Sequence, residues 1–250
     1  MQYHLDTIPV WEAMEWKGEC PLCSLERKTE VEEIERTLGA SVMEPDVRIR
    51  FNERGVCGKH QQMLFAQQNK LGHALLMDSR VKAQLTALQA LQKKVESART
   101  ARRSLFGKGS STSTVTDELK ALQAHCVVCE AVDIHMRRYR DTFLHLWKTN
   151  PDFRSAWKQS NGVCLPHLQA LLETSGDVLS AEQQNEFTAE ALAFLTDRLA
   201  NDEKDLDWFT RKFDYRFQAE PWGESKTAVE RSVNRLRGWC VGSEPYPQKK

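Results

Sequence analysis

Six of the seven cysteines and two of the seven histidines fall into one pattern that occurs twice in the chain. The first copy is Cys20-x2-Cys23 with Cys57-x2-His60, and the second is Cys126-x2-Cys129 with Cys164-x2-His167. The two CxxC pairs lie 106 residues apart and the two CxxH pairs 107 residues apart, and the dipeptide Gly-Val precedes each CxxH pair. A repeated set of chemically reactive residues in register indicates an internal duplication.

This pattern is typical of metal coordination. Two cysteines separated by two residues can turn both sulfurs toward one ion, and a second pair supplies the other corners of a tetrahedron. Cys3His is a closed zinc set without an open position for water, so we expect about two zinc ions per chain in structural roles. Our working assignment places one ion in each half, although the spacing leaves open an exchange of pairs between halves. The predicted ligand sets are Cys20, Cys23, Cys57 and His60, and Cys126, Cys129, Cys164 and His167.

Two other chemistries fit part of the pattern. Three cysteines and a histidine can hold an iron–sulfur cluster, although the close three-cysteine run of common ferredoxins is absent. Cys20-Pro21-Leu22-Cys23 can also act as a redox dithiol, since a cysteine pair at a helix start favours thiolates. That interpretation leaves both CxxH pairs unexplained. Cys240 lies outside the pattern and is treated as an incidental free thiol.

The segments around these motifs predict an all-α protein. Pro21 suits the first position of a helix that ends at Gly39. With Cys20 as the N-cap, both thiolates of the first CxxC lie at the positive end of the helix dipole. The alternation of Val47, Ile49 and Phe51 with arginines indicates one short strand over 47–51.

The domain organisation follows from the duplication. Residues 1–105 form the first CxxC…CxxH helical repeat, and 117–240 form the second together with C-terminal helices. The Gly-, Ser- and Thr-rich stretch 106–116 between them has the composition of a flexible linker. We expect 241–250 to be a disordered tail. The predicted fold is a helical bundle of two related halves, each tied by a Cys3His metal site.

The two ends of the chain share a mixture of aromatic and charged residues. Both ends can pack as irregular tails across the bundle, with an ion pair between Asp214 and Arg216. A second interpretation joins the ends into a polar-aromatic pocket. Its residues are His4, Asp6, Asp214, Tyr215 and Arg216.

Composition limits the class of protein. Lys plus Arg and Asp plus Glu each number 35, and this zero net charge argues against a dedicated nucleic-acid binder. No apolar run approaches the ~18–20 residues of a membrane span. The first residues lack the basic and apolar regions of an export signal. An odd number of cysteines argues against a disulfide framework, so we expect a cytoplasmic protein.

Several segments together resemble an uncharacterised bacterial family known as a domain of unknown function. They are residues 3–11, 18–23, 42–48, 162–167, 213–216 and 221–223. The resemblance covers nearly the whole chain and includes all eight Cys and His positions of the duplicated pattern. It implies a relative without an assigned activity.

These observations lead to two function hypotheses. The first is a zinc-binding adaptor that presents helical surface to another protein. The second is an enzyme or redox protein that uses an iron–sulfur cluster, a dithiol or the terminal pocket. Oligomeric state does not follow from the sequence.

Overall fold

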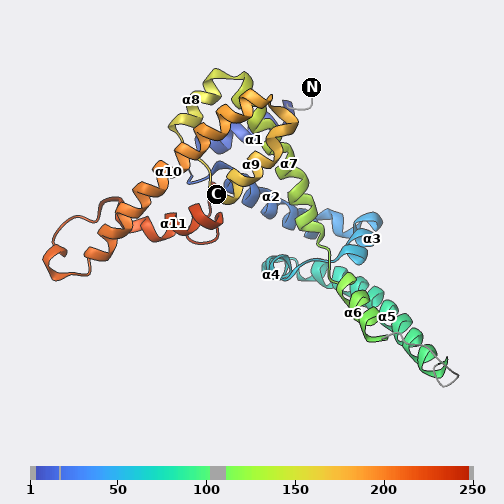
Figure 1. Cartoon of the computed structure of the whole chain (residues 1–250). Helices are drawn as coiled ribbons and strands as arrows, with labels where there is room; N and C mark the ends of the chain where they lie inside the picture. The colour runs from blue at the N-terminus through green and yellow to red at the C-terminus, as the bar shows by residue number, and fades with distance from the viewer. Residues whose placement is uncertain (1–3, 17, 102–110, 248–250) are drawn as a thin grey trace. The chain divides into compact units, whose positions relative to one another are not determined.

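The computed structural model describes residues 4–16, 18–101 and 111–247, with backbone alone at residues 4–5, 98–101 and 111. Within these residues the chain forms eleven α-helices, three short 3-10 helices and no strand (Figure 1). The prediction of an all-α protein is confirmed.

The helices follow one another through short connections. They are α1 (His4–Glu15), α2 (Pro21–Leu38), η1 (Ala40–Met43), α3 (Pro45–Arg54), α4 (Gly58–Ala66), α5 (Lys70–Ala101), α6 (Ser111–Ala121), α7 (Val127–Thr149), α8 (Pro151–Gln159), α9 (Leu165–Val178), α10 (Ala181–Arg211), η2 (Tyr215–Phe217), η3 (Gly223–Thr227) and α11 (Ala228–Arg237).

Local signals in the sequence explain several helix boundaries. Proline occupies the first position of α2, α3 and α8, where its missing N–H costs no hydrogen bond. The Asn150 side chain caps α8 by accepting from two backbone N–H groups. At α10 the side chains of Ser180 and Gln183 form the capping box that their spacing predicts.

The chain divides into two compact units. Unit 1 contains residues 1–29 and 134–250, and unit 2 contains residues 30–133. The boundaries fall inside α2 and inside α7. Each unit therefore takes segments from both halves of the sequence pattern, and the units do not coincide with those halves.

The core of unit 1 is rich in aromatic residues. Phe143 on α7 contacts Phe153 and Trp157 on α8 edge to face, with ring centroids 5.1 and 5.4 Å apart. Trp147 makes a similar contact with Phe187 on α10 at 5.2 Å. All five side chains are fully buried. Each such pair stabilises the fold by about 0.5–1.5 kcal/mol beyond the contribution from burying its surface area.

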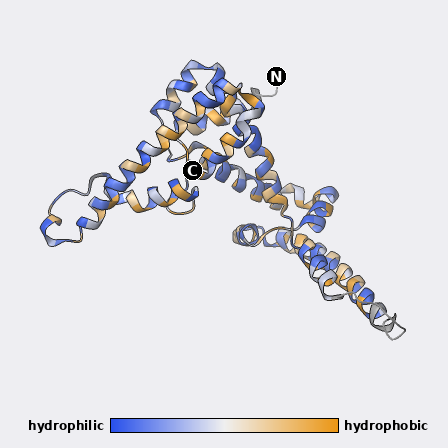
Figure 2. Cartoon of the chain, in the orientation of Figure 1, coloured by the Kyte–Doolittle hydropathy of each residue, from blue (hydrophilic) through white to orange (hydrophobic). Residues whose placement is uncertain are grey.

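The core of unit 2 is mainly aliphatic. It joins α2, α3, α4 and α5, and α3 packs against α5. Fully buried members are Ile34, Phe51, Leu64 and Leu76. Figure 2 shows hydrophobic and hydrophilic residues interspersed along these helices, as expected where one face of a helix meets a core.

The short strand expected at 47–51 is wrong, because this segment lies within α3. Val47 and Phe51 are four residues apart and share a helix face, so their spacing fits a helix as well as a strand. Phe51 is buried while Ile49 between them is 54% exposed. Pro45 at the start of α3 and Gly55, with φ of 67°, at its end give the helix its boundaries.

The linker and the tail also have structure where they are described. Residues 106–110 lie outside the described residues, whereas 111–116 form the start of α6. Residues 241–247 are described and hold contacts with α2. Arg27 donates to Glu244, and Ser24 Oγ donates to the Pro245 carbonyl at 2.6 Å. Residues 248–250 lie outside the description.

None of the helices in the described part of the chain combines the length and the apolar composition that crossing a bilayer requires.

Candidate metal centres

The structure gathers the eight Cys and His side chains of the repeated motifs into two groups. In each group the four donor atoms lie within 4.8 Å of one another. Each group lies within one unit of the chain. Centre 1, in unit 1, consists of Cys20, Cys23, Cys164 and His167, and centre 2, in unit 2, consists of Cys57, His60, Cys126 and Cys129.

The grouping of the motifs differs from the working assignment. We expected the CxxC and CxxH of the same half to meet, and the structure instead joins the CxxC of each half to the CxxH of the other. The reason lies in the tertiary structure, which places the helix ends that carry these motifs in different units. α2 and α9 belong to unit 1 at their N-terminal ends, whereas α4 and the start of α7 belong to unit 2.

All four motifs use the same local structure, a helix N-terminus. The first cysteine directly precedes the helix and the second ligand lies three residues further on, in α2, α4, α7 and α9. The carbonyl of that first cysteine accepts the first helical hydrogen bond in each case, for example Cys57 O from Gln61 N at 2.9 Å. The positive end of the helix dipole favours the thiolate form that a metal requires.

The glycine of each Gly-Val-Cys sequence has a conformational role. Gly55 and Gly162 have φ of 67° and 79°, a region that side chains rarely adopt. A Cβ on Gly162 would lie 2.6 Å from the ring of Phe194, and one on Gly55 would lie 2.9 Å from Arg80 Nη2. The chain therefore needs glycine at both positions to bring the CxxH motif into place.

Centre 1 is compact and buried. His167 Nδ1 lies 3.6, 3.4 and 3.2 Å from the sulfurs of Cys20, Cys23 and Cys164, respectively. The sulfurs of Cys23 and Cys164 are 3.6 Å apart. All four side chains are less than a tenth exposed.

Centre 2 has the same arrangement. His60 Nδ1 lies 3.3, 3.2 and 3.4 Å from the sulfurs of Cys57, Cys126 and Cys129, respectively. The sulfurs of Cys57 and Cys129 are 3.9 Å apart. Cys57 and Cys129 are only half-buried, so this centre is nearer to solvent than centre 1.

These distances match the edges of a tetrahedron around one ion. Bond lengths of zinc to sulfur and nitrogen place two sulfurs about 3.8 Å apart and a sulfur about 3.6 Å from a nitrogen. Sulfurs 3.6 and 3.9 Å apart are too distant for a disulfide of about 2.05 Å, and all seven cysteines are free thiols. The donor sets therefore fit a metal ion at both centres.

Each histidine is oriented by a glutamate that sequence reasoning missed. His60 Nε2 lies 2.8 Å from Glu30 Oε1, and His167 Nε2 lies 3.4 Å from Glu26 Oε2. A carboxylate on the second ring nitrogen fixes the tautomer and leaves Nδ1 to the metal, as at many zinc sites. Both glutamates lie on α2, three and seven residues after Cys23, and no local motif distinguishes them from its other acids.

In centre 2 the close contact between the donor side chains shifts their pKa values in opposite directions. Burial opposes ionisation of Cys126, but hydrogen bonds from His60 and from the Cys129 amide lower the pKa of its thiol to about 6. Burial and the neighbouring Cys126 sulfur raise the pKa of Cys129 to about 12. Burial disfavours the charged imidazole, yet hydrogen bonds with Cys126 and Glu30 raise the pKa of His60 to about 10.

In centre 1 the pKa values of the cysteine thiols are also shifted in opposite directions. Despite its burial, hydrogen bonds from the neighbouring thiols and the charge of His167 hold the pKa of Cys20 well below its usual range. Hydrogen bonds with Cys164 and Cys20, together with burial, raise the pKa of Cys23. The first thiolate raises the cost of ionising its neighbours, and a bound divalent cation would remove that cost.

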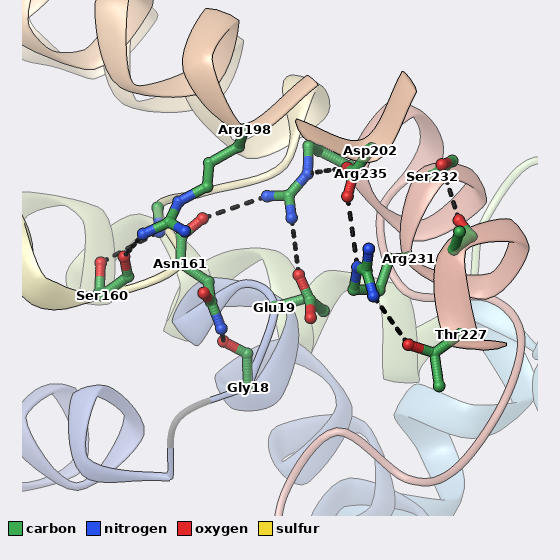
Figure 3. Close-up of polar contacts among 12 residues, drawn as sticks. Gly18, Glu19, Ser160, Asn161, Arg198, Asp202, Thr227, Arg231, Ser232 and Arg235 are labelled. Atoms are coloured by element: carbon green, nitrogen blue, oxygen red, sulfur yellow. Dashed lines mark hydrogen bonds and ion pairs between the residues drawn. The ribbon is translucent and has the colours of Figure 1, made fainter. Parts of the chain in front are cut away.

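A buried ion network fastens the two loops that carry centre 1 (Figure 3). Arg235 on α11 is 3% exposed and pairs with Asp202 Oδ2 at 2.5 Å. The same guanidinium donates to Glu19 Oε2 at 2.7 Å and to the Asn161 carbonyl at 3.1 Å. Glu19 directly precedes Cys20, and Asn161 lies three residues before Cys164, so Arg235 ties together the approaches to both ligand pairs.

The residues of the expected terminal pocket have other partners. Asp6 is buried and accepts two hydrogen bonds from Arg138 on α7, at 2.6 and 3.0 Å. Asp214 and Arg216 pair with each other at 2.6 Å, as one of the two interpretations predicts, and Tyr215 beside them is 81% exposed. The structure thus gives Asp6 and Asp214 separate partners. The side chain of His4 lies outside the described residues.

The chain belongs to the family of unknown function DUF6062, whose profile matches residues 1–243. This match confirms the resemblance to an uncharacterised domain family and spans all eight ligands of the two centres. No curated protein and no solved structure matches the chain significantly.

Proposed function

We propose that the protein is a zinc protein in which two Cys3His centres hold the helical fold together. The observation that carries this proposal is the convergence of three sulfurs and one Nδ1, at tetrahedral edge distances, at two places in the chain. Two supporting features are the helix N-terminus behind every motif and the glutamate behind each histidine. Both favour deprotonated, oriented ligands.

The compactness of the donor sets favours a single ion over a cluster. A polynuclear iron–sulfur core separates its protein ligands by the distances between its own metals, so the ligands lie farther apart than around one ion. Four donors within 4.8 Å leave space for one ion. Among single ions, Cys and His ligands at tetrahedral spacing are typical of zinc.

A structural role follows from how far apart the ligand pairs lie in the sequence. Centre 1 joins pairs separated by 140 residues, and centre 2 joins pairs separated by 65. Structural zinc binding contributes on the order of 10 kcal/mol per site in zinc-finger peptides. Four protein ligands leave no coordination position for a substrate.

We therefore infer a binding module rather than an enzyme, with another protein as its partner. Cysteines that bind metal in place of forming disulfides are typical of a reducing compartment, so we infer a cytoplasmic location. The alternative is a redox protein that uses a cluster or the Cys20–Cys23 dithiol. Iron and sulfide in the purified protein would support the cluster form of this alternative.

Elemental analysis of protein purified without a metal-affinity tag tests the proposal, together with a visible spectrum. We expect about two zinc ions per chain and no absorbance in the visible range. Iron and sulfide with absorbance near 400 nm would replace this proposal by the redox alternative. Protein without metal and with reduced thiols would contradict the zinc proposal and the cluster, and would leave the Cys20–Cys23 dithiol as the remaining alternative.

Cysteine variants connect the metal to the fold. We expect Cys57→Ser and Cys164→Ser each to remove about one zinc ion and to lower the melting temperature. Cys240→Ser is the matched control, because Cys240 is exposed and belongs to neither centre. A fully metallated and equally stable Cys57→Ser protein would contradict the assignment.

A further inference from the structure

A cavity of about 440 Å³ lies in unit 2 beside centre 2. Its walls come from α3, α4, α5 and the residues that follow α6. Cys57 forms part of one wall, so a molecule in the cavity lies against the metal centre. The volume falls within the range of small-ligand pockets, about 300–1,000 Å³.

Three basic side chains line this cavity. They are Arg54, Arg80 and His125, and neither aspartate nor glutamate belongs to the lining. The chain as a whole has equal numbers of acidic and basic residues, so this lining is more basic than the chain average. Such a lining attracts anions.

Arg80 supplies positive charge without a carboxylate partner. Its Nη2 donates to the Leu122 carbonyl at 2.9 Å, its Nη1 donates to the Asn52 carbonyl, and it forms no ion pair within the described residues. Burial lowers the pKa of this guanidinium. Arg54 and His125 differ, since Arg54 Nη1 and His125 Nδ1 lie 3.5 and 3.6 Å from Glu130, respectively.

The side chain that faces the Arg80 guanidinium is a neutral amide and not a carboxylate. Gln84 lies one turn further along α5 with its side-chain amide facing the guanidinium, and with the amide oxygen turned toward Arg80 it would accept from Nη1 at 3.0 Å. An amide oxygen fills the acceptor position but leaves the charge uncompensated. The cavity therefore keeps a positively charged group that a bound anion can neutralise through charge-assisted hydrogen bonds.

The rest of the lining is apolar. Phe51, Val56, Met77 and Leu122 form this part of the wall. We propose that the cavity beside centre 2 binds a small organic anion, with a phosphate or carboxylate head at Arg80 and an apolar body against Phe51 and Met77. Arginine suits such heads because its planar fork of N–H groups matches their oxygen atoms.

Calorimetric titration of the metal-loaded full chain tests this proposal with phenyl phosphate as the probe. We expect one binding site per chain, with affinity that falls as salt is raised. Inorganic phosphate, which lacks the body, and phenol, which lacks the head, should both bind at least about tenfold more weakly. Benzoate replaces phenyl phosphate in a parallel titration and shows which head is preferred.

Gln84→Glu provides the sharpest variant, because it gives Arg80 a carboxylate partner without removing side-chain volume. We expect it to weaken phenyl phosphate binding by about tenfold or more, which corresponds to ~1.4 kcal/mol. Gln89→Glu is the matched control, since it places the same charge on an exposed position of α5 outside the cavity. It should leave the affinity unchanged.

Two results would overturn the proposal. One is the absence of saturable phenyl phosphate binding to wild-type protein at millimolar concentration. The other is equal loss of affinity in Gln84→Glu and Gln89→Glu, which would place the effect in the overall charge of the chain. Melting temperature and zinc content of each variant show whether its fold is intact.

Discussion

At the scale of single residues, Glu30 is a carboxylate in a buried position that requires polar partners. Its side chain is 6% exposed, and one of its oxygens lies 2.8 Å from His60 Nε2 and 2.5 Å from Lys59 Nζ. A buried carboxylate needs such partners, because desolvation of an unpaired charge is costly. Glu26 behind His167 is half exposed and more distant, so it orients its imidazole less strictly.

We expect Glu30→Gln to weaken zinc binding at centre 2 by roughly 10- to 100-fold, the usual effect of removing a carboxylate behind a metal-binding histidine. The amide keeps an acceptor for His60 but loses the negative charge. Competition with a chromogenic chelator measures the two sites, and centre 1 serves as the internal reference. Glu26→Gln is expected to have the smaller effect on its own centre, and the reverse order would contradict this account.

At the scale of elements, the segment 239–246 after α11 covers centre 1. The Trp239 amide donates to Cys23 Sγ at 3.2 Å, and the Arg27 guanidinium stacks 5.1 Å from the Trp239 ring. Arg27 also forms two hydrogen bonds with Glu244, at 2.7 and 2.9 Å. The segment therefore shields the Cys23 sulfur from solvent and is held to α2 beside the centre.

We expect a chain that ends at Gly238 to release zinc from centre 1 several-fold faster, because the amide at Cys23 and the covering indole are lost. Zinc transfer to excess chelator is followed over time, and release from centre 2 should keep its wild-type rate. Arg27→Gln removes the ion pair with Glu244 and the contact with the Trp239 ring but keeps the segment, so it should have an intermediate effect. Equal acceleration at both centres would indicate general destabilisation instead.

Local sequence signals predicted the elements well wherever a specific residue determines a boundary. Pro21 is one example, because its ring fixes the local backbone geometry, and the pair Ser180 and Gln183 is another, because their side chains cap the helix end. They failed at 47–51, where Val47 and Phe51 fit one face of either a helix or a strand. They failed again at 111–116, where a Ser- and Thr-rich composition suggested a linker but the chain forms the first turns of α6.

At the scale of the whole molecule, the sequence pointed to the eight Cys and His residues that the structure gathers into two groups, and it could not predict their grouping. Spacing within a CxxC or CxxH motif is a local property, and the sequence alone shows which pairs are candidates for metal binding. Which pairs meet depends on how α2, α4, α7 and α9 pack. The spacing of the eight Cys and His residues in the sequence is compatible with either grouping. Glu26 and Glu30 were missed for the same reason.

Double variants test the grouping directly. Cys23→Ser combined with Cys164→Ser affects centre 1 alone, so we expect the loss of about one zinc ion and a destabilisation close to that of either single change. Cys23→Ser combined with Cys57→Ser affects both centres and should remove about two ions. The opposite pattern in the elemental analysis would restore the grouping within each half.

The two centres are nested along the chain, and this nesting gives them an order of formation during synthesis. The ligands of centre 2, between residues 57 and 129, all emerge from the ribosome before Cys164 and His167 of centre 1. At about 5–20 residues per second, the last ligand of centre 1 follows that of centre 2 by roughly 2–8 s. Cys20 and Cys23 lack the partners of centre 1 throughout that interval, and we expect the closure of centre 2 to withdraw Cys57 and His60 from them once Cys126 and Cys129 have emerged.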